Sequence, residues 1–223
     1  MLNCIMQRIR WGLLLAFVLP GWTDDVQVPI ELFNGRDLAG WFVFIPDANI
    51  DPGGVWVVQD GVLRTSGVPH GYIRTTQKYA DYRLTFEWRW PEQGGNSGVL
   101  LHLRDKDEVW PEGYETQLQS EHAGDMFVIG EAEFKEHTDP NDRRVIKKRP
   151  HNEKPIGEWN EYEIVCEDNT IRVRINGQEQ NAATECTVAE GYIGFQSEGT
   201  PIEFRNLTLW PLDGIPAKDK ARH

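Results

Sequence analysis

FEWRWPEQGGNSGVLLHLRDKDEVWPEGYETQLQ, residues 86–119, is the stretch that decides the fold class. Its first five residues alternate aromatic and charged side chains, which is the period-two pattern of a strand with one buried face. A glycine-rich corner at Gly94–Gly98 precedes the apolar run Val99–Leu103. Residues 114–119, YETQLQ, alternate again. The stretch therefore predicts consecutive strands of a β-sheet joined by shaped loops.

The second face of the last of these strands is polar. If Tyr114 faces a core, then Glu115, Gln117 and Gln119 face the other way, toward water or a ligand. His102 is set in the neighbouring strand. This polar row is either a binding site or a solvated sheet face, and the rest of the chain has to distinguish the two.

The composition favours an all-β protein of one domain. The chain has 223 residues with nine Trp, nine Phe, six Tyr, 21 Gly and 13 Pro, and it lacks long helix-forming blocks. The formal net charge is −12, so nucleic acid and an anionic membrane surface are excluded as expected partners.

Turn signals divide the rest of the chain into short strands. Asp60-Gly61 and Asn176-Gly177 each separate two apolar runs and predict tight hairpins. We therefore expect a single antiparallel β-sandwich over residues 28–212. Residues 120–155 show no regular pattern, and they predict an irregular loop region that forms a rim or lid over the polar face.

The two ends of the chain are expected to lie outside this domain. Residues 1–22 carry a basic start and the apolar run Trp11–Leu19, which is typical of an export signal; an uncleaved N-terminal anchor is the alternative. The predicted location is periplasmic or extracellular, with no other membrane contact. Export would permit a disulfide between Cys166 and Cys186, and simple packing of Cys166 in the core is the alternative. Residues 213–223 form a charged tail.

Seven separated blocks, in order, resemble the 3-keto-disaccharide hydrolase domain family. The blocks are LFNGRDLAGW (Leu32–Trp41), WVVQDGVL (Trp56–Leu63), GNSGVLLH (Gly95–His102), GYETQL (Gly113–Leu118), GEWNEYEIVC (Gly157–Cys166), RINGQ (Arg174–Gln178) and GYIGFQSEGTPIEFRNLTL (Gly191–Leu209).

The resemblance implies both a fold and an activity. The fold is the concanavalin A-like jelly roll, a single-domain all-β antiparallel β-sandwich, in agreement with the strand pattern. The activity is cleavage of glycosides already oxidised to a ketone at C3, by hydrolysis or by elimination of the aglycone. A sugar 3-oxidoreductase would have to supply such a substrate. The ketone acidifies the C2 proton, so the site needs a base near C2, donors for an enolate oxygen and an acid for the leaving oxygen.

The candidate catalytic residues are Glu115 and His102. Glu115 is the first choice for the acid or base, against the alternative of a carboxylate that only holds neighbouring strands. His102 is a candidate for proton transfer, for donation to the enolate or for metal binding, against a structural role. The candidate substrate-binding residues are polar or aromatic side chains near this face: Gln117, Gln196, Glu198, Arg74, Asn96, Glu87 and Trp110.

A divalent metal held by His102, Glu115 and a third oxygen ligand is a further hypothesis, although no closely spaced ligand motif supports it. Two other functions compete with the cleavage of 3-keto-glycosides: an ordinary retaining glycosidase and a carbohydrate-binding module. A retaining glycosidase of this architecture carries E-x-D-x-x-E on one strand, whereas Gln117 follows Glu115 here. A non-catalytic carbohydrate-binding module is the alternative that we retain.

Overall fold

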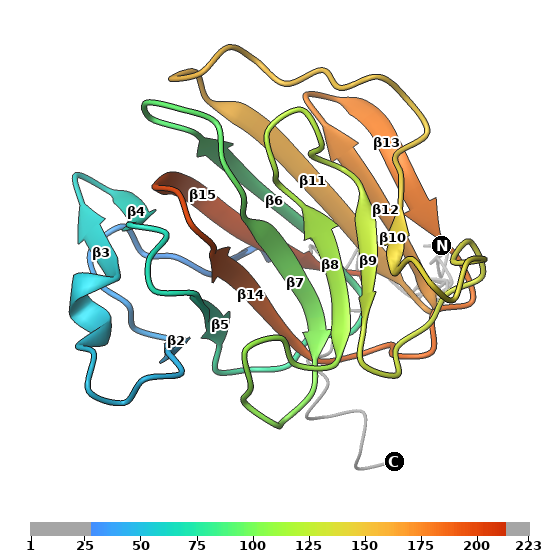
Figure 1. Cartoon of the computed structure of the whole chain (residues 1–223), viewed down its shortest axis with the longest axis horizontal. Coiled ribbons are helices and arrows are strands. Elements are labelled where there is room, and N and C mark those ends of the chain that lie inside the picture. The colour runs from blue at the N-terminus through green and yellow to red at the C-terminus, as the bar shows by residue number, and fades with distance from the viewer. Residues whose placement is uncertain (1–27, 213–223) are drawn as a thin grey trace, which may run out of the picture.

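A computed structural model describes residues 28–212 as two packed antiparallel β-sheets (Figure 1). The eight-stranded sheet has the order β13 (Gln178–Ala183), β12 (Thr170–Ile175), β11 (Asn160–Glu167), β6 (Tyr82–Arg89), β15 (Ile202–Pro211), β4 (Val62–Thr65) and β3 (Trp56–Gln59), with β1 (Ile30–Glu31) paired to β15. The seven-stranded sheet has the order β10 (Arg144–Val145), β9 (Met126–Ile129), β8 (Gly113–Gln117), β7 (Gly98–Leu103), β14 (Tyr192–Ser197), β5 (Gly71–Thr75) and β2 (Trp41–Phe44). The short 3-10 helix η1 covers Pro52–Gly54.

The core lies between the two sheets and is built by the predicted alternation. In β6 every second residue is buried, and Phe86 and Trp88 face inward. Phe86 stacks on Tyr162 of β11 with 5.1 Å between ring centroids and meets Phe195 of β14 edge-on at 5.2 Å. Burial of such large apolar side chains is the main force that holds the sheets face to face. The predicted all-β sandwich is confirmed.

The stretch that follows β6 moves the chain from one sheet to the other. After Arg89 the glycine-rich corner carries the chain across, and β7 and β8 then form the middle of the second sheet beside β14 (Figure 1). The predicted hairpins are also present. Asp60 and Gly61 have φ angles of 53° and 76°, and Asn176 and Gly177 have 48° and 77°. These positive φ values are those of the two central residues of a type I′ turn.

The region 120–155 is more regular than the sequence suggests. It contributes β9 and β10, which extend the seven-stranded sheet beyond β8. The fully buried Asp125 carboxylate holds this region, because it accepts hydrogen bonds from the Arg144 guanidinium and from the Lys147 backbone N–H. These strands are only four and two residues long, so they leave little periodic signal in the sequence.

Cys166 and Cys186 are both buried and free. Cys166 packs in the core, as the alternative to a disulfide predicted. The expected signal segment, residues 1–22, and the charged tail, residues 213–223, both lie outside the described residues. Within residues 28–212 no helix is long and apolar enough to cross a membrane.

Candidate functional site

The outer face of the seven-stranded sheet carries the polar row that the sequence predicts. We call it the site face, and it includes Tyr72, Gly98, Leu100, Glu115 and Gln196. Strand register places these residues side by side: Leu100 lies opposite Glu115, and Tyr72 lies opposite Gln196. Their chain neighbours face the core instead. The parity of β8 read from the sequence is therefore confirmed.

Glu115 is the most perturbed carboxyl of this face. Only 6% of the residue is exposed. Burial, with a smaller contribution from the Glu198 carboxylate, raises the pKa of Glu115 to about 8, while the Gln196 side chain and Arg143 partly offset the rise. Glu115 is consequently protonated in most molecules at neutral pH. A carboxyl in this state can donate a proton to a leaving oxygen.

A glycine allows Glu115 and Gln196 to meet. They stand on β8 and β14, on either side of Gly98 in β7. A Cβ added at Gly98 would lie 2.5 Å from an oxygen of each side chain, so only glycine leaves room for both. The Gln196 Oε1 is buried and has no hydrogen-bond partner among the described residues. A buried amide oxygen in this condition can accept a proton from the protonated Glu115 carboxyl or from a ligand hydroxyl.

Glu198 supplies a second carboxyl from a different strand. It follows β14 and forms an isolated bridge with Asn96. Burial raises the pKa of Glu198, and His70 and Arg143 act in the opposite direction. The Asn96 Oδ1 is also buried without a partner in the described part of the chain. Two carboxyls and two unpaired amide oxygens thus gather at this end of the site face.

A cation stands at the edge of the same site. Phe127 of β9 lies directly opposite Glu115, and the Arg143 guanidinium carbon lies 5.7 Å from the Phe127 ring centroid. Within residues 28–212 Arg143 has no carboxylate within ion-pair distance, whereas the adjacent Arg144 is bonded to Asp125. Arg143 is therefore available to a negatively charged group at the site.

Gln117 shares the face of Glu115 but has a local task. Its Oε1 accepts hydrogen bonds from the backbone N–H groups of Leu118 and Gln119, at 2.8 Å each. The side chain shapes the end of β8. Its oxygen is already occupied, so the oxygen of Gln117 does not serve a ligand in this arrangement.

His102 lies away from Glu115, which differs from the expectation of a shared polar face. Two residues of β7, Leu101 and His102, oppose Ile193 of β14, and His102 has a φ of 56°. This β-bulge turns the imidazole into the core, where it meets Tyr82 edge-on at 5.8 Å. Its Nδ1–H donates to the carbonyl of Val188 at 2.9 Å, and burial lowers the pKa to about 4. The structural alternative for His102 fits this geometry.

Three other candidates lie apart from Glu115. Arg74 and Trp110 are on the site face, toward β5, where Arg74 is bonded to a loop carboxylate. Glu87 lies on the other sheet and bonds Arg205, beside a cavity of about 390 Å³ on that sheet's outer face. The strand parity of Glu87 was correct, but parity alone does not say which sheet a strand joins.

The hypothesis of a metal held by His102 and Glu115 is wrong in its ligands, because the two side chains point to opposite faces of the sheet. Among residues 28–212 no group of three or more His, Cys, Asp and Glu side chains is arranged to hold a metal ion.

Sequence reasoning missed Arg143, His70 and Tyr72 as members of the site face. Arg143 belongs to a basic run that reads as a solvated surface, and only the pairing of β10 with β9 brings it beside Phe127. The one available signal was the position of this run, directly after the polar row in the chain.

Comparison with known proteins adds to this geometry. The sequence model of the 3-keto-alpha-glucoside-1,2-lyase-like domain family matches residues 28–209. The chain belongs to this family. The membership confirms the resemblance carried by the seven sequence blocks.

Relatives of this family member are distant in sequence. A Bacteroides thetaiotaomicron protein named 3-keto-disaccharide hydrolase is 22% identical over 248 residues, covering 85% of this chain and 82% of that protein. The crystal structure of a Parabacteroides distasonis protein described as a glycosyl hydrolase superposes with a TM-score of 0.63 and 22% identity, covering 83% of this chain and 94% of the other. A carbohydrate-binding module from Bacillus subtilis superposes with a TM-score of 0.57 and 12% identity, covering 77% and 95%. The structural likenesses establish the jelly-roll fold.

Proposed function

We propose that this family member cleaves the glycosidic bond of 3-keto-glycosides, with Glu115 as the proton donor. The observation that carries the proposal is the buried Glu115 carboxyl, whose pKa of about 8 keeps it protonated at neutral pH beside Gln196 and Glu198. The family membership and the distant relative named 3-keto-disaccharide hydrolase support the substrate class.

The chemistry begins with a proton on the carbon beside the ketone. A base removes the C2 proton, and its electron pair forms an enolate whose charge rests on the C3 oxygen. The enolate then expels the group at C1: the C1–O bond breaks, its electron pair goes to the aglycone oxygen, and that oxygen takes a proton. Addition of water across the resulting C1=C2 bond gives net hydrolysis. Without this addition the product is that of a lyase.

The site offers one group for each requirement. Protonated Glu115 is the acid for the leaving oxygen, and Glu198, which is less buried, is the base at C2. Arg143, with no carboxylate at ion-pair distance within residues 28–212, is placed to stabilise the enolate oxygen. The unpaired oxygens of Gln196 and Asn96 accept sugar hydroxyls. Raised carboxyl pKa values and unpaired buried acceptors are typical of catalytic sites rather than of solvated faces.

The test compares 4-nitrophenyl glucoside with its 3-keto derivative. We expect nitrophenol release from the keto compound alone, with a loss of about 10²- to 10⁴-fold in Glu198→Gln, as is usual for a general base. Nitrophenol leaves with little help from an acid, so Glu115→Gln should show a loss of that size with a methyl 3-keto-glucoside and a much smaller loss with the nitrophenyl compound. The control Glu131→Gln removes a carboxyl from the exposed turn after β9 and should be as active as the wild type. Deuterium at C2 should slow release if proton removal limits the rate.

Other outcomes would favour the competing functions. Rapid release from the unoxidised glucoside would indicate an ordinary glycosidase that uses Glu115 and Glu198 as its carboxyl pair. No release from either compound, with sugar binding that survives Glu115→Gln, would indicate a carbohydrate-binding module, the activity named for one structural neighbour. An assay with a chelator examines a metal requirement.

A further inference from the structure

The connection between β7 and β8, residues 104–112, is long for a hairpin and folds over the site face. Hairpin loops usually have two to about five residues. The base of this loop is closed by a hydrogen bond from the Arg104 N–H to the Glu112 carbonyl at 3.1 Å. In Figure 1 the loop projects, in green, from the lower end of the front sheet. Its side chains reach strands that are distant in the sequence.

Asp107 ties the tip of the loop to β5. Its carboxylate accepts a hydrogen bond from the Tyr72 hydroxyl at 2.9 Å and two from the Arg74 guanidinium at 3.1 and 3.2 Å. The guanidinium carbon lies 4.5 Å from the ring centroid of Phe42 and 4.0 Å from that of Tyr192. A bidentate Arg–carboxylate pair held between two rings has a fixed geometry. The tip of the loop is thus anchored rather than loose.

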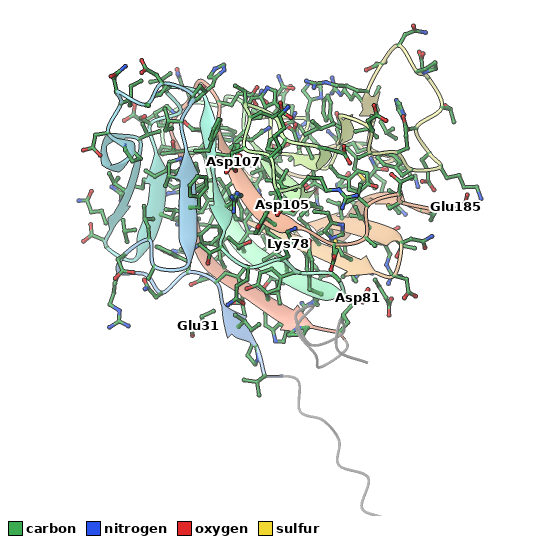
Figure 2. The ribbon with its side chains drawn as sticks, turned by 90° about the horizontal axis from the view of Figure 1, so that it is seen from below. Glu31, Lys78, Asp81, Asp105, Asp107 and Glu185 are labelled. Carbon is green, nitrogen blue, oxygen red and sulfur yellow. The ribbon has the colours of Figure 1, made fainter. Side chains whose placement is uncertain are left out.

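Asp105 provides a second tie on the next strand. Its carboxylate accepts hydrogen bonds from the Tyr192 hydroxyl of β14 at 3.1 Å and from the Lys78 ammonium at 2.7 Å. Figure 2 shows Asp105 and Lys78 beside one another, with Asp107 further along the same loop. Two carboxylates therefore fasten the loop to β14 and β5.

Apolar contacts cover the sheet beneath these ties. Tyr72 and Leu100 point outward on the site face, yet neither has any exposed surface. Both belong to a small apolar cluster with Leu103 and Ile129, against which Trp110 of the loop packs. Outward-facing side chains on an open sheet would contact water, so the complete burial of Tyr72 and Leu100 means that other side chains lie over them.

The covered area begins next to the carboxyl of the site. Leu100 is directly opposite Glu115, and Tyr72 is directly opposite Gln196. Leu100 stands on β7, next to β8, and Tyr72 stands two strands further along the sheet, on β5. At the level of these two buried side chains, the site face is therefore closed beside Glu115 on the side of β14, β5 and β2.

We propose that the loop of residues 104–112 is a fixed wall that ends the site face at Trp110 and Tyr72, so that the substrate is a short 3-keto-glycoside whose chain terminates there. Asp107 and Trp110 are the specificity-determining residues of this wall. This inference rests on the proposed function. It excludes a long polysaccharide that passes across all strands of the sheet.

The test measures kcat/KM on a ladder of three substrates. The first is a 3-keto-glucoside with a small aglycone, the second carries two further glucose units on the aglycone, and the third carries a glucosyl group at O6 of the oxidised ring. We expect the wild type to accept one extension and to disfavour the other by at least about tenfold. Asp107→Ala should reduce that discrimination by a similar factor. Equal use of both extensions by the wild type would overturn the proposal, and this arm needs no variant.

Glu108→Ala is the matched control. Glu108 is the next carboxylate of the same loop, and among the described residues 28–212 it bonds Lys106 alone, two residues away. The Glu108→Ala variant should discriminate between the two extended substrates as strongly as the wild type does. If Asp107→Ala fails to fold, Trp110→Ala shortens the wall while leaving both ties. If Asp107→Ala and Trp110→Ala fold and still discriminate between the two extensions as the wild type does, the loop is not the wall that limits the substrate.

Failure of the proposed function gives a different result. If no keto compound is cleaved, calorimetric titration with unoxidised glucose oligomers of two to six units replaces the kinetic ladder. Affinity that stops rising beyond about two units in the wild type, but continues to rise in Asp107→Ala, supports the wall alone. Affinity that rises with each added unit in the wild type, or no binding at all, overturns it.

Discussion

Replacing Glu115 by Gln should make the protein more stable at neutral pH while it removes the activity. The carboxyl has an ordinary pKa of 4.5 and a pKa of about 8 in the folded protein. Between these two values the unfolded chain has lost its proton and the folded chain still holds it, so the folded state becomes progressively less stable as pH rises. Glutamine has a similar shape and no ionisable group, so the stability of Glu115→Gln does not fall with pH for this reason.

The magnitude follows from the size of the shift. Each unit of pKa corresponds to about 1.4 kcal/mol, so the roughly 2.5 units between 4.5 and pH 7 amount to about 3 kcal/mol. Below about pH 4 the carboxyl is protonated in both states, and this contribution disappears. Above about pH 8 both states are ionised, and the contribution levels off near about 5 kcal/mol.

The assay is urea unfolding of wild type and Glu115→Gln at intervals from pH 4 to pH 9. The difference in unfolding free energy between the two proteins isolates Glu115, because groups common to both largely cancel. Glu131→Gln controls for the removal of one negative charge from an exposed position. A difference between wild type and Glu115→Gln that is constant from pH 4 to pH 9 would refute the reasoning. It would mean that Glu115 is ionised and solvated in the folded protein, and the role of proton donor would fail with it.

Two other substitutions test the local geometry. Gly98→Ala places a methyl group 2.5 Å from oxygens of both Glu115 and Gln196. Turnover should therefore fall at least about tenfold, and the free energy of unfolding should fall by about 1–3 kcal/mol, as in other overpacked sites. In the control Gly54→Ala nothing lies within 4 Å of the new atom, so neither turnover nor stability should change. His102→Gln removes an imidazole whose pKa is lowered to about 4, so the variant should lack the loss of stability that the wild type suffers as pH falls from about 6.5 to about 4. The pH profile of kcat for folded His102→Gln should match that of the wild type, and a missing limb near neutral pH would instead place His102 in the reaction.

Much of the fold follows from local patterns in the sequence. The alternation in β6, β8, β11 and β12, together with the Asp60-Gly61 and Asn176-Gly177 turns, predicts the strands and hairpins that the structure contains. Glu115 could be placed on the polar face by the same reasoning. The reason is that side-chain direction in a regular strand depends only on parity, which is a property of the chain itself.

Parity fails where the strand is irregular or where two distant segments meet. His102 obeys the period-two rule in the sequence, but the bulge in β7 turns it into the core. Arg143 and Asp107 lie in segments without a period, and both come to the site face through contacts with Phe127, Tyr72 and Arg74.

The sequence by itself determined the two-sheet class, the family and the outward direction of Glu115, because periodicity, turn chemistry and ordered blocks are all local information. Only the tertiary structure decided what surrounds that carboxyl. The pairing of β8 with β7, and of β7 with β14, brings Gln196 and Glu198 to it, and the absence of a side chain at Gly98 gives Glu115 and Gln196 room. The raised pKa of Glu115 comes from burial among these non-local neighbours, and burial is a property of the packed sheet rather than of any single strand.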